Sequence, residues 1–311
     1  VRVHAERQDR IQKNGATPLA RDGVVVEDNL RENLAVSAFI QNRVLLGRLT
    51  LTPGLRLERV SYDRTNRLAN GGAGVSGHTD LAQWIPGVGA AFAASTRLTV
   101  FGGVHRGFAP PRTEDIINNG TGGVVELDPE LSWDTEIGVR WAARSGANLD
   151  ATWFRMDYEN QIVPASLAGG IGATLTNGGE TLHQGIEVAG RLDSAGVLPT
   201  RHNVFARVSY TWLPTAEFTG TRFSTVPGSA GTSVTGNRLP YAPEQLLTLT
   251  LGYQHPGGID AQVELVRVGD QFSDDLNSVT PSADGQRGLI PGHTVWNAAI
   301  SYLIAPLKGS V

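Results

Sequence analysis

The chain has 311 residues, and its 26 basic and 30 acidic residues give a formal net charge of −4, which argues against a nucleic-acid-binding protein. It contains no cysteine, so disulfides, cysteine-based zinc sites and thiol nucleophiles are excluded. The 38 glycines, and the absence of any run of about eighteen apolar residues, favour a turn-rich β protein without a transmembrane helix.

The first sixty residues predict three strands. Residues 1–10 alternate in part and predict one strand, whereas 11–30 hold Gly, Pro, Asn and mixed charges and predict a long loop. Apolar and polar residues then alternate from 32 to 41. A tight turn near Asn42–Arg43 leads into the next strand, at about 44–62. Its period of two continues over a length that an amphipathic helix cannot imitate.

The middle of the chain repeats this pattern of strands, short turns and long loops. The glycine-rich segment 63–81 predicts a loop, and a second long loop is expected at 109–130. Short turns are expected at Ser95–Thr96 and at Arg144–Ala147. The predicted strands are 82–94, 97–107, 127–141 and 149–163.

The last part of the chain begins with a loop at 164–173. The segment TLTNGGETLHQGIEVAGRLD (174–193) predicts one long strand that is bent at Asn177–Gly179 or carries a bulge there. A short link at 194–202 follows, and a His-Pro-Gly-Gly sequence predicts a later tight turn. The remaining strands are 203–213, 244–255, 259–268 and 294–303, and the remaining long loops are 214–243 and 271–292.

In this assignment short turns and long loops alternate without exception. Because successive connections of an antiparallel up-and-down sheet fall on opposite edges, all the long loops lie on one side. Only a closed sheet satisfies every backbone donor and acceptor in hydrocarbon. The sequence therefore predicts an all-β fold, the portion of an antiparallel transmembrane β-barrel with about twelve strands, short periplasmic turns and long extracellular loops.

Charged and aromatic residues have expected places in such a barrel. The charged residues of the strands should share the face that lines a wet lumen, and the aromatic residues should form girdles near strand ends. The expected lumen residues are Arg48, Arg56, Glu58, Asp134, Glu136, Arg140, Glu187, Arg191, Arg207, Asp260 and Glu264. The aromatic residues are Trp84, Trp133, Trp141, Trp153, Tyr210, Trp212, Tyr253, Trp296 and Tyr302.

Seven segments carry a resemblance to a known family. They are LTLTPGLRLE (49–58), WIPGVGAAF (84–92), HRGFAPPRTEDI (105–116), LDPELSWDTEIGVRW (127–141), WFRMDYENQIV (153–163), TNGGETLHQGIEV (176–188) and LIPGHTVWNAAISY (289–302). Their sequence, order and spacing resemble the barrel of TonB-dependent outer-membrane receptors, most of all the ferric-citrate and ferric-siderophore branch.

The resemblance implies a receptor of the bacterial outer membrane and not an enzyme. The family's barrels have roughly 22 strands and are plugged by an N-terminal domain. Residues 1–311 are then expected to be a barrel fragment that lacks the plug, the first strands and the final strands. Within the lipid bilayer the receptor would import a ferric siderophore or ferric citrate, driven by TonB–ExbB–ExbD through the missing plug. It needs no cofactor, since iron enters only as a chelate.

The resemblance also implies that the outer loops catch the ligand. Ferric chelates are commonly anionic, and arginine offers them paired donors. Taken singly, each such residue is more often solvated or paired with a loop acid such as Glu114, Asp115 or Asp274. The expected contacts are Arg64, His78, Arg106, Arg112, Arg222, Arg238 and Tyr241, with Arg106 and Arg112 favoured because they flank GFAPP.

Other chemistry has little support in the sequence. Asp134 and Glu136 alternate along a strand and predict lumen lining rather than a glycosidase acid pair, and DPELSWDTE lacks the calcium-loop pattern. The seven histidines show no zinc-binding spacing. Two rival functions remain open: a secreted or surface β protein that binds carbohydrate with its polar face outward, and a passive porin.

Overall fold

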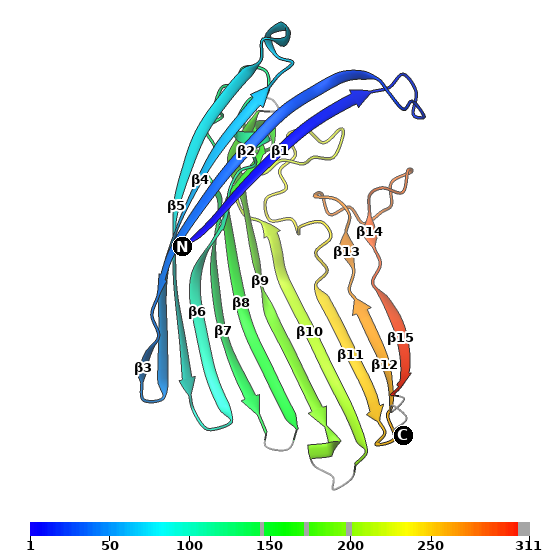
Figure 1. The fold of residues 1–311 in the computed structure, drawn as a ribbon. Helices are drawn as coiled ribbons and strands as arrows, with labels where there is room; N and C mark the ends of the chain where they lie inside the picture. Colours follow the sequence, from blue (N-terminus) through cyan, green and yellow to red (C-terminus); the bar gives the residue numbers. More distant parts are fainter. Residues whose placement is uncertain (144–145, 171–173, 197–200, 304–311) are drawn as a thin grey trace, which may run out of the picture.

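The computed structural model describes residues 1–143, 146–170, 174–196 and 201–303. Twelve strands form one antiparallel sheet, which curves into an open wall with β1 and β15 at its two edges (Figure 1). The strands are β1 (Arg2–Asn14), β2 (Val24–Gln41), β4 (Leu49–Asn66), β5 (Val75–Ala93), β6 (Leu98–Ala109), β7 (Glu130–Ala142), β8 (Ala147–Pro164), β9 (Leu175–Asp193), β10 (Asn203–Phe218), β11 (Gln245–Gln254), β12 (Ile259–Val268) and β15 (His293–Tyr302).

Several short elements lie in the connections between the long strands. Strand β3 (Val44–Leu46) pairs with β4, and β13 (Gln271–Phe272) pairs with β14 (Leu289–Ile290) within one loop. The helices are α1 (Thr113–Ile116) and the 3₁₀ turns η1 (Asn70–Gly72), η2 (Ala165–Leu167) and η3 (Ser194–Gly196). Within the described residues, no helix is long and apolar enough to cross a membrane.

The predicted fold class is confirmed. Neighbouring strands in the sheet follow one another along the chain, except that β2 pairs with β4 past the short β3, and β12 pairs with β15 across the loop that holds β13 and β14. The long loops extend from the upper end of the wall and the short turns lie at the lower end (Figure 1). Of the predicted turns, 144–145, 197–200 and the turn near 305 lie outside the described residues.

Three predicted loops are too long and one predicted turn is misplaced. The loops expected at 11–30 and 63–81 shrink to 15–23 and 67–74, because the strands on either side extend further. The loop expected at 214–243 begins only at 219, because β10 extends to Phe218. The chain reverses at Gly47, whose φ of 63° suits glycine, and not at Asn42–Arg43. Arg48 therefore lies in a turn rather than in a strand. The extra strand residues mix polar side chains with apolar ones, such as the consecutive Val24, Val25 and Val26, so no alternating apolar period marks them in the sequence.

The bend predicted at Asn177–Gly179 is a double register shift between β8 and β9. Tyr158 faces Thr181, Gln161 faces Gly179, and Ile162 faces Asn177, so each strand contributes one extra residue. The Asn177 amide stabilises this irregular backbone by donating to the carbonyl oxygens of Asp128 and Asn160, both at 2.8 Å. The bulge prediction is therefore confirmed.

The register divides the side chains between two faces of the wall. Directly opposed residues of an antiparallel pair lie on the same face, and the chain of pairs Gly103–Glu136–Phe154–Gly185 links the strands in the middle of the wall. We call the side with Glu136 the inner face and the opposite side the outer face. The predicted lumen residues on the inner face are Arg56, Glu58, Asp134, Glu136, Arg140, Glu187, Arg191, Arg207, Asp260 and Glu264.

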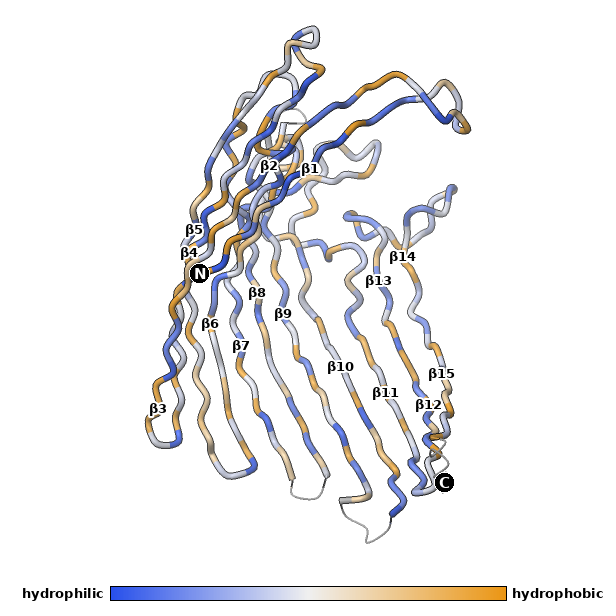
Figure 2. Tube along the Cα trace, viewed as in Figure 1, coloured by the Kyte–Doolittle hydropathy of each residue, from blue (hydrophilic) through white to orange (hydrophobic). Residues whose placement is uncertain are grey.

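The outer face is mainly apolar and aromatic over the lower part of the wall. Hydrophobic and hydrophilic residues alternate along these strands (Figure 2). All nine aromatic residues singled out from the sequence lie on the outer face by register, for example Trp84 opposite Leu57 and Trp296 opposite Leu265. This division suits a wall with hydrocarbon on one side and water on the other.

Several charges on the inner face are paired with each other. Arg56 contacts Glu58, Arg191 contacts Asp193 at 2.5 Å, and Arg140 contacts Asp150 at 2.7 Å. His105 Nε2 lies 3.3 Å from Asp134 Oδ2. Asp134 and Glu136 are thus part of a polar lining, as predicted.

The division of faces predicts opposite effects for neighbouring residues of β11. Leu249→Arg would place a charge on the outer face and is expected to lower the free energy of unfolding in lipid by about 2 to 4 kcal/mol near the bilayer centre. Thr248→Arg, one residue away on the inner face, is expected to cost less than about 1 kcal/mol. Urea titration in phospholipid vesicles measures both, and equal losses would contradict the assignment of faces.

Candidate functional site

Two long loops at the upper end of the wall are joined into one unit. We call the β10–β11 loop (219–244) and the β12–β15 loop (269–292) the loop pair. Tyr241 N donates to Phe272 O at 2.8 Å, and Asn237 Nδ2 donates to Asp275 O at 2.9 Å. Arg238 N donates to Asn277 Oδ1 at 2.8 Å, and Asn277 Nδ2 donates back to Arg238 O at 2.7 Å. The two loops therefore fix each other's backbone.

Two adjacent buried carboxylates organise the loop pair. Asp275 accepts hydrogen bonds from Ser224 Oγ at 2.6 Å and from Thr225 N at 2.7 Å, both on the opposite loop. Asp274 instead accepts from its own loop, including Leu276 N at 3.0 Å and Gly288 N at 3.3 Å. Asp275 thus bonds the β10–β11 loop, and its neighbour Asp274 bonds the β12–β15 loop. Both buried carboxylates are satisfied by hydrogen-bond donors.

A cavity of about 620 Å³ opens between the two loops. We call it the loop cavity. Its lining mixes cations, carboxylates and flat apolar surfaces, and it contains two of the residues that the sequence predicts as ligand contacts, Arg222 and Tyr241. The lining includes Phe218, Arg222, Pro240, Tyr241, Asp284 and Arg287.

Arg222 is a lining cation with one donor that has no partner among the described residues. Its guanidinium lies over the Phe218 ring, with 5.6 Å from Cζ to the ring centroid. The Nε–H is buried and has no hydrogen-bond partner among the described residues. Burial lowers the pKa of Arg222, and the nearby Asp275 carboxylate acts in the opposite direction. Arginine nevertheless stays charged at neutral pH, so the side chain can offer a charge-assisted hydrogen bond to an anionic ligand.

Arg238 has a different role from the one predicted. Its side chain donates to three backbone carbonyls: Nε to Ala242 O at 2.8 Å, Nη1 to Pro214 O at 3.1 Å and Nη2 to Leu213 O at 2.7 Å. Burial lowers the pKa of Arg238, and Glu244 raises it in part. These donors hold the loop, so the geometry does not favour Arg238 as a ligand contact.

Arg64 lies in a strand and not in a loop, which corrects its predicted place. It sits on the inner face of β4 beneath the β6–β7 connection, residues 110–129, which we call the strap. Ile117 of the strap is fully buried and packs with Val60 and Tyr62 of β4. Arg64 is 6% exposed, and its Nη1 donates to Ile117 O at 2.8 Å. Arg64 therefore holds the strap against the wall.

Arg112 belongs to the strap, and it forms an ion pair with Asp115 at the protein surface. Its side chain is 74% exposed. Its Nε donates to Asp115 Oδ2 at 2.8 Å and its Nη2 to Asp115 Oδ1 at 3.3 Å. Arg112 is therefore paired with a loop acid, which is the alternative to ligand contact that the sequence suggests. A ligand could recruit Arg112 only in competition with Asp115.

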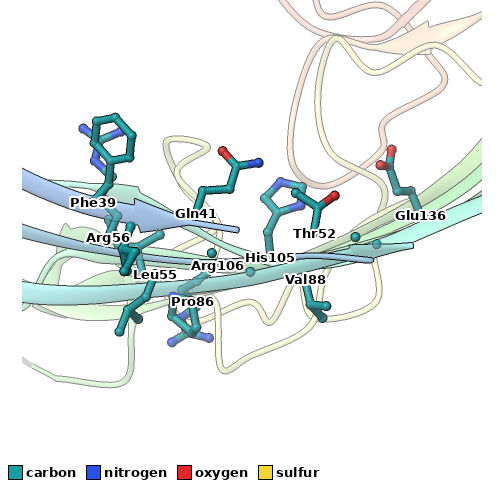
Figure 3. Close-up of a pocket in the computed structure, with 16 residues that line it drawn as sticks. Phe39, Gln41, Thr52, Leu55, Arg56, Pro86, Val88, His105, Arg106 and Glu136 are labelled. Atoms are coloured by element: carbon teal, nitrogen blue, oxygen red, sulfur yellow. The ribbon is translucent and has the colours of Figure 1, made fainter. Parts of the chain in front are cut away.

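Arg106 and His78 lie on the outer face, away from the loop cavity. Arg106 points to the same side of the sheet as Leu55, Pro86 and Val88, opposite to His105 (Figure 3). It contacts Glu159 and lies 4.8 Å from the Trp133 ring centroid.

His78 is part of β5, not of a loop, and faces Asp63 of β4 in register. Its Nδ1 lies 2.9 Å from Asp63 Oδ1. Alternation along the strands places both His78 and Arg106 opposite to the inner face, so neither joins Arg222 and Tyr241.

Sequence reasoning missed the residues that build the site. Asp275 and Asn277 join the two loops, and Ile117 anchors the strap. Asp and Asn are common in turns because their side chains bond nearby backbone groups, so DDLN (274–277) signals local turn structure. Nothing in that pattern indicates that Asp275 reaches a loop about fifty residues earlier in the chain.

Within the described part of the chain, the loop cavity is not built as a metal site. Among the residues that the structure describes, no group of three or more His, Cys, Asp or Glu side chains is arranged to hold a metal ion. The loop cavity instead combines a partly unpartnered guanidinium with the exposed ring of Tyr241. This chemistry suits an anionic ligand with apolar or aromatic surface.

Comparison with known families gives one match over nearly the whole chain. The family described as "TonB dependent receptor-like, beta-barrel" matches residues 6–308.

Solved structures share the fold at low sequence identity. The unliganded ferric citrate transporter FecA matches with a TM-score of 0.73 and 20% identity, covering 97% of this chain and 47% of that chain. The siderophore receptor PiuA from Acinetobacter baumannii matches at 0.68 and 18%, covering 91% and 38%. The ferric-catecholate import receptor Fiu from E. coli matches at 0.64 and 17%, covering 98% and 44%. The chain thus spans less than half the length of each.

The packing of the strap predicts a specific effect at Gly77. A Cβ at Gly77 would lie 2.3 Å from Gly122 O and 2.5 Å from Ile117 Cγ2, so Gly77→Ala should push the strap off the wall. Gly89→Ala on the same strand is the matched control, because its Cβ would meet only Gly102 O, at 3.9 Å. Amide hydrogen exchange of residues 116–125 should rise roughly tenfold in Gly77→Ala alone. Unchanged exchange would contradict the strap packing.

Proposed function

This chain belongs to the TonB-dependent receptor-like β-barrel family, and we propose that it forms the wall and ligand-binding mouth of a bacterial outer-membrane receptor that imports a ferric chelate. The family consists of receptors and transporters rather than enzymes. The observation that carries the proposal is the loop cavity, which places Arg222 and Tyr241 together at the loop end of a membrane-spanning wall.

Three features support a ferric chelate as the ligand. Similar folds occur in proteins described as a ferric citrate transporter, a siderophore receptor and a ferric-catecholate import receptor. The charged guanidinium of Arg222 lines the loop cavity, and arginine suits the anionic oxygens of a ferric citrate or ferric siderophore. The Tyr241 ring is 64% exposed at the same cavity and offers a flat contact surface.

The two rival functions have less support. A carbohydrate-binding β protein with its polar face outward would leave that face in water, whereas here the strap packs against the upper inner face through Ile117. A passive porin would need no interlocked loops at its mouth. We propose instead that transport is energised by TonB–ExbB–ExbD through a plug region, and that the wall and loops serve ligand capture.

Removal of the Arg222 charge is the direct test of the binding site. Arg222→Gln is expected to weaken binding of the preferred ferric chelate by about 10- to 100-fold, the equivalent of one lost charge-assisted hydrogen bond. Arg59→Gln is the matched control, because Arg59 is an exposed cation on the outer face that pairs with Asp80. Titration of the detergent-purified receptor with ferric citrate, a ferric tris-catecholate and a ferric hydroxamate measures the affinities.

The same panel decides the function. Tight binding of at least one ferric chelate, and uptake of radiolabelled iron that a protonophore abolishes, are the expected results. A receptor that binds none of the three chelates would overturn the proposal. Uptake that persists without the proton gradient, with steady pore conductance in planar bilayers, would favour the passive porin.

A further inference from the structure

Tyr241 adopts a backbone conformation that its residue type disfavours. Its φ is 56°, in the left-handed region where a side chain with a Cβ is disfavoured. The residue is 64% exposed, so burial of its side chain does not stabilise the conformation. Strained residues of this kind persist only where the surroundings hold them, and they cluster at ligand-binding sites.

The structure holds Tyr241 from both sides. On its N-terminal side, Arg238 exchanges two hydrogen bonds with the side chain of Asn277 across the loop pair. On its C-terminal side, Ala242 O accepts from Arg238 Nε at 2.8 Å. The Tyr241 backbone N–H itself donates to Phe272 O at 2.8 Å. Segment 238–242 is therefore fixed before, at and after Tyr241.

Arg238 is suited to this task by shape rather than by charge. Its planar fork reaches carbonyl oxygens on two separate segments, Leu213–Pro214 within β10 and Ala242 in the loop. No ion pair involves Arg238 among the described residues. A lysine is a point charge on a flexible stem and cannot reproduce these fixed directions.

Asn277 completes the arrangement from the opposite loop. It also has a left-handed φ, 56°, which asparagine tolerates better than most residues. Its carboxamide uses both the oxygen and the nitrogen on Arg238. An aspartate of the same shape would lose the donor, because an ionised carboxylate only accepts hydrogen bonds.

We propose that Arg238 and Asn277 are positioning residues that present the Tyr241 ring at the mouth of the loop cavity as an aromatic contact for the ferric chelate. This inference rests on the proposed function. A purely structural clamp would not need an aromatic residue at position 241, since glycine adopts a φ of 56° without strain. At position 241 the ring is what tyrosine adds over glycine, at the cost of the strained backbone.

Substitution at position 241 separates binding from structure. Tyr241→Gly should relieve the backbone strain and leave the loop pair at least as resistant to limited proteolysis, yet weaken chelate binding about tenfold through loss of the ring. Tyr241→Phe keeps the ring and should retain affinity within about threefold. Unchanged affinity in Tyr241→Gly would overturn the inference.

A double-mutant cycle tests whether Arg238 acts through Tyr241. With the tightest-binding of ferric citrate, the ferric tris-catecholate and the ferric hydroxamate, Arg238→Gln should weaken binding about fivefold in the parent receptor. In the Tyr241→Gly background it should weaken binding less than about twofold. Asn277→Asp should behave as Arg238→Gln does, and Arg59→Gln should have no effect in either background. Additive losses would mean that Arg238 contributes independently of Tyr241, and would overturn the inference.

A spin label tests the positioning without any ligand. Because residues 1–311 contain no cysteine, a Tyr241→Cys variant can be labelled with one nitroxide, at position 241. The label should be immobilised when Tyr241→Cys is the only change. It should be mobile when Arg238→Gln or Asn277→Asp is added, and equal mobility in all three proteins would overturn the positioning role. If the unaltered receptor binds no chelate, the proposed function fails and the ligand role of Tyr241 fails with it. Bound chelate together with additive losses overturns this inference alone.

Discussion

The antiparallel hydrogen-bond ladder is the constraint on which the rest of this structure depends. Each strand pairs with its neighbour along a fixed register, so a residue that faces inward on one strand aligns with inward residues across the wall. A shift of one residue would exchange the two faces of that strand and place its charges in hydrocarbon. Arg56, Glu136 and Glu187 thus share one lining although they are far apart in sequence.

Above the apolar band the ladder continues without the hydrophobic pattern that marks it below. Strands β2, β4 and β5 continue there with mixed apolar and polar residues, and cross-strand pairs such as Arg59–Asp80 lie on the outer face. The strap uses the inner face of this extension, since Ile116 and Ile117 form with Val60 and Tyr62 a small hydrophobic cluster at the upper end of the wall. The extension therefore provides a foundation on which a connection can fold.

The loop pair solves a different problem, because long loops carry many backbone groups that need partners. Asp274 satisfies donors of its own loop and Asp275 those of the other. Arg238 satisfies carbonyls of two segments. With these polar side chains committed to structure, Arg222 and Tyr241 stay available at the loop cavity. A rigid mouth on a rigid wall is preorganised for binding, which lowers the ordering cost of capturing a ligand.

The sequence by itself determined the strand order, the two faces and the alternation of short and long connections, because a period of two and the turn residues are local signals. It also indicated the bulge near Asn177 and placed Arg222 and Tyr241 among candidate contacts. Only the tertiary structure decided that His78 lies in a strand and points outward, that Arg106 contacts Glu159, that Arg64 lies beneath the strap and that Arg238 clamps the loop. These outcomes depend on register and on contacts between distant segments, such as Asp275 with Ser224, which no local pattern encodes.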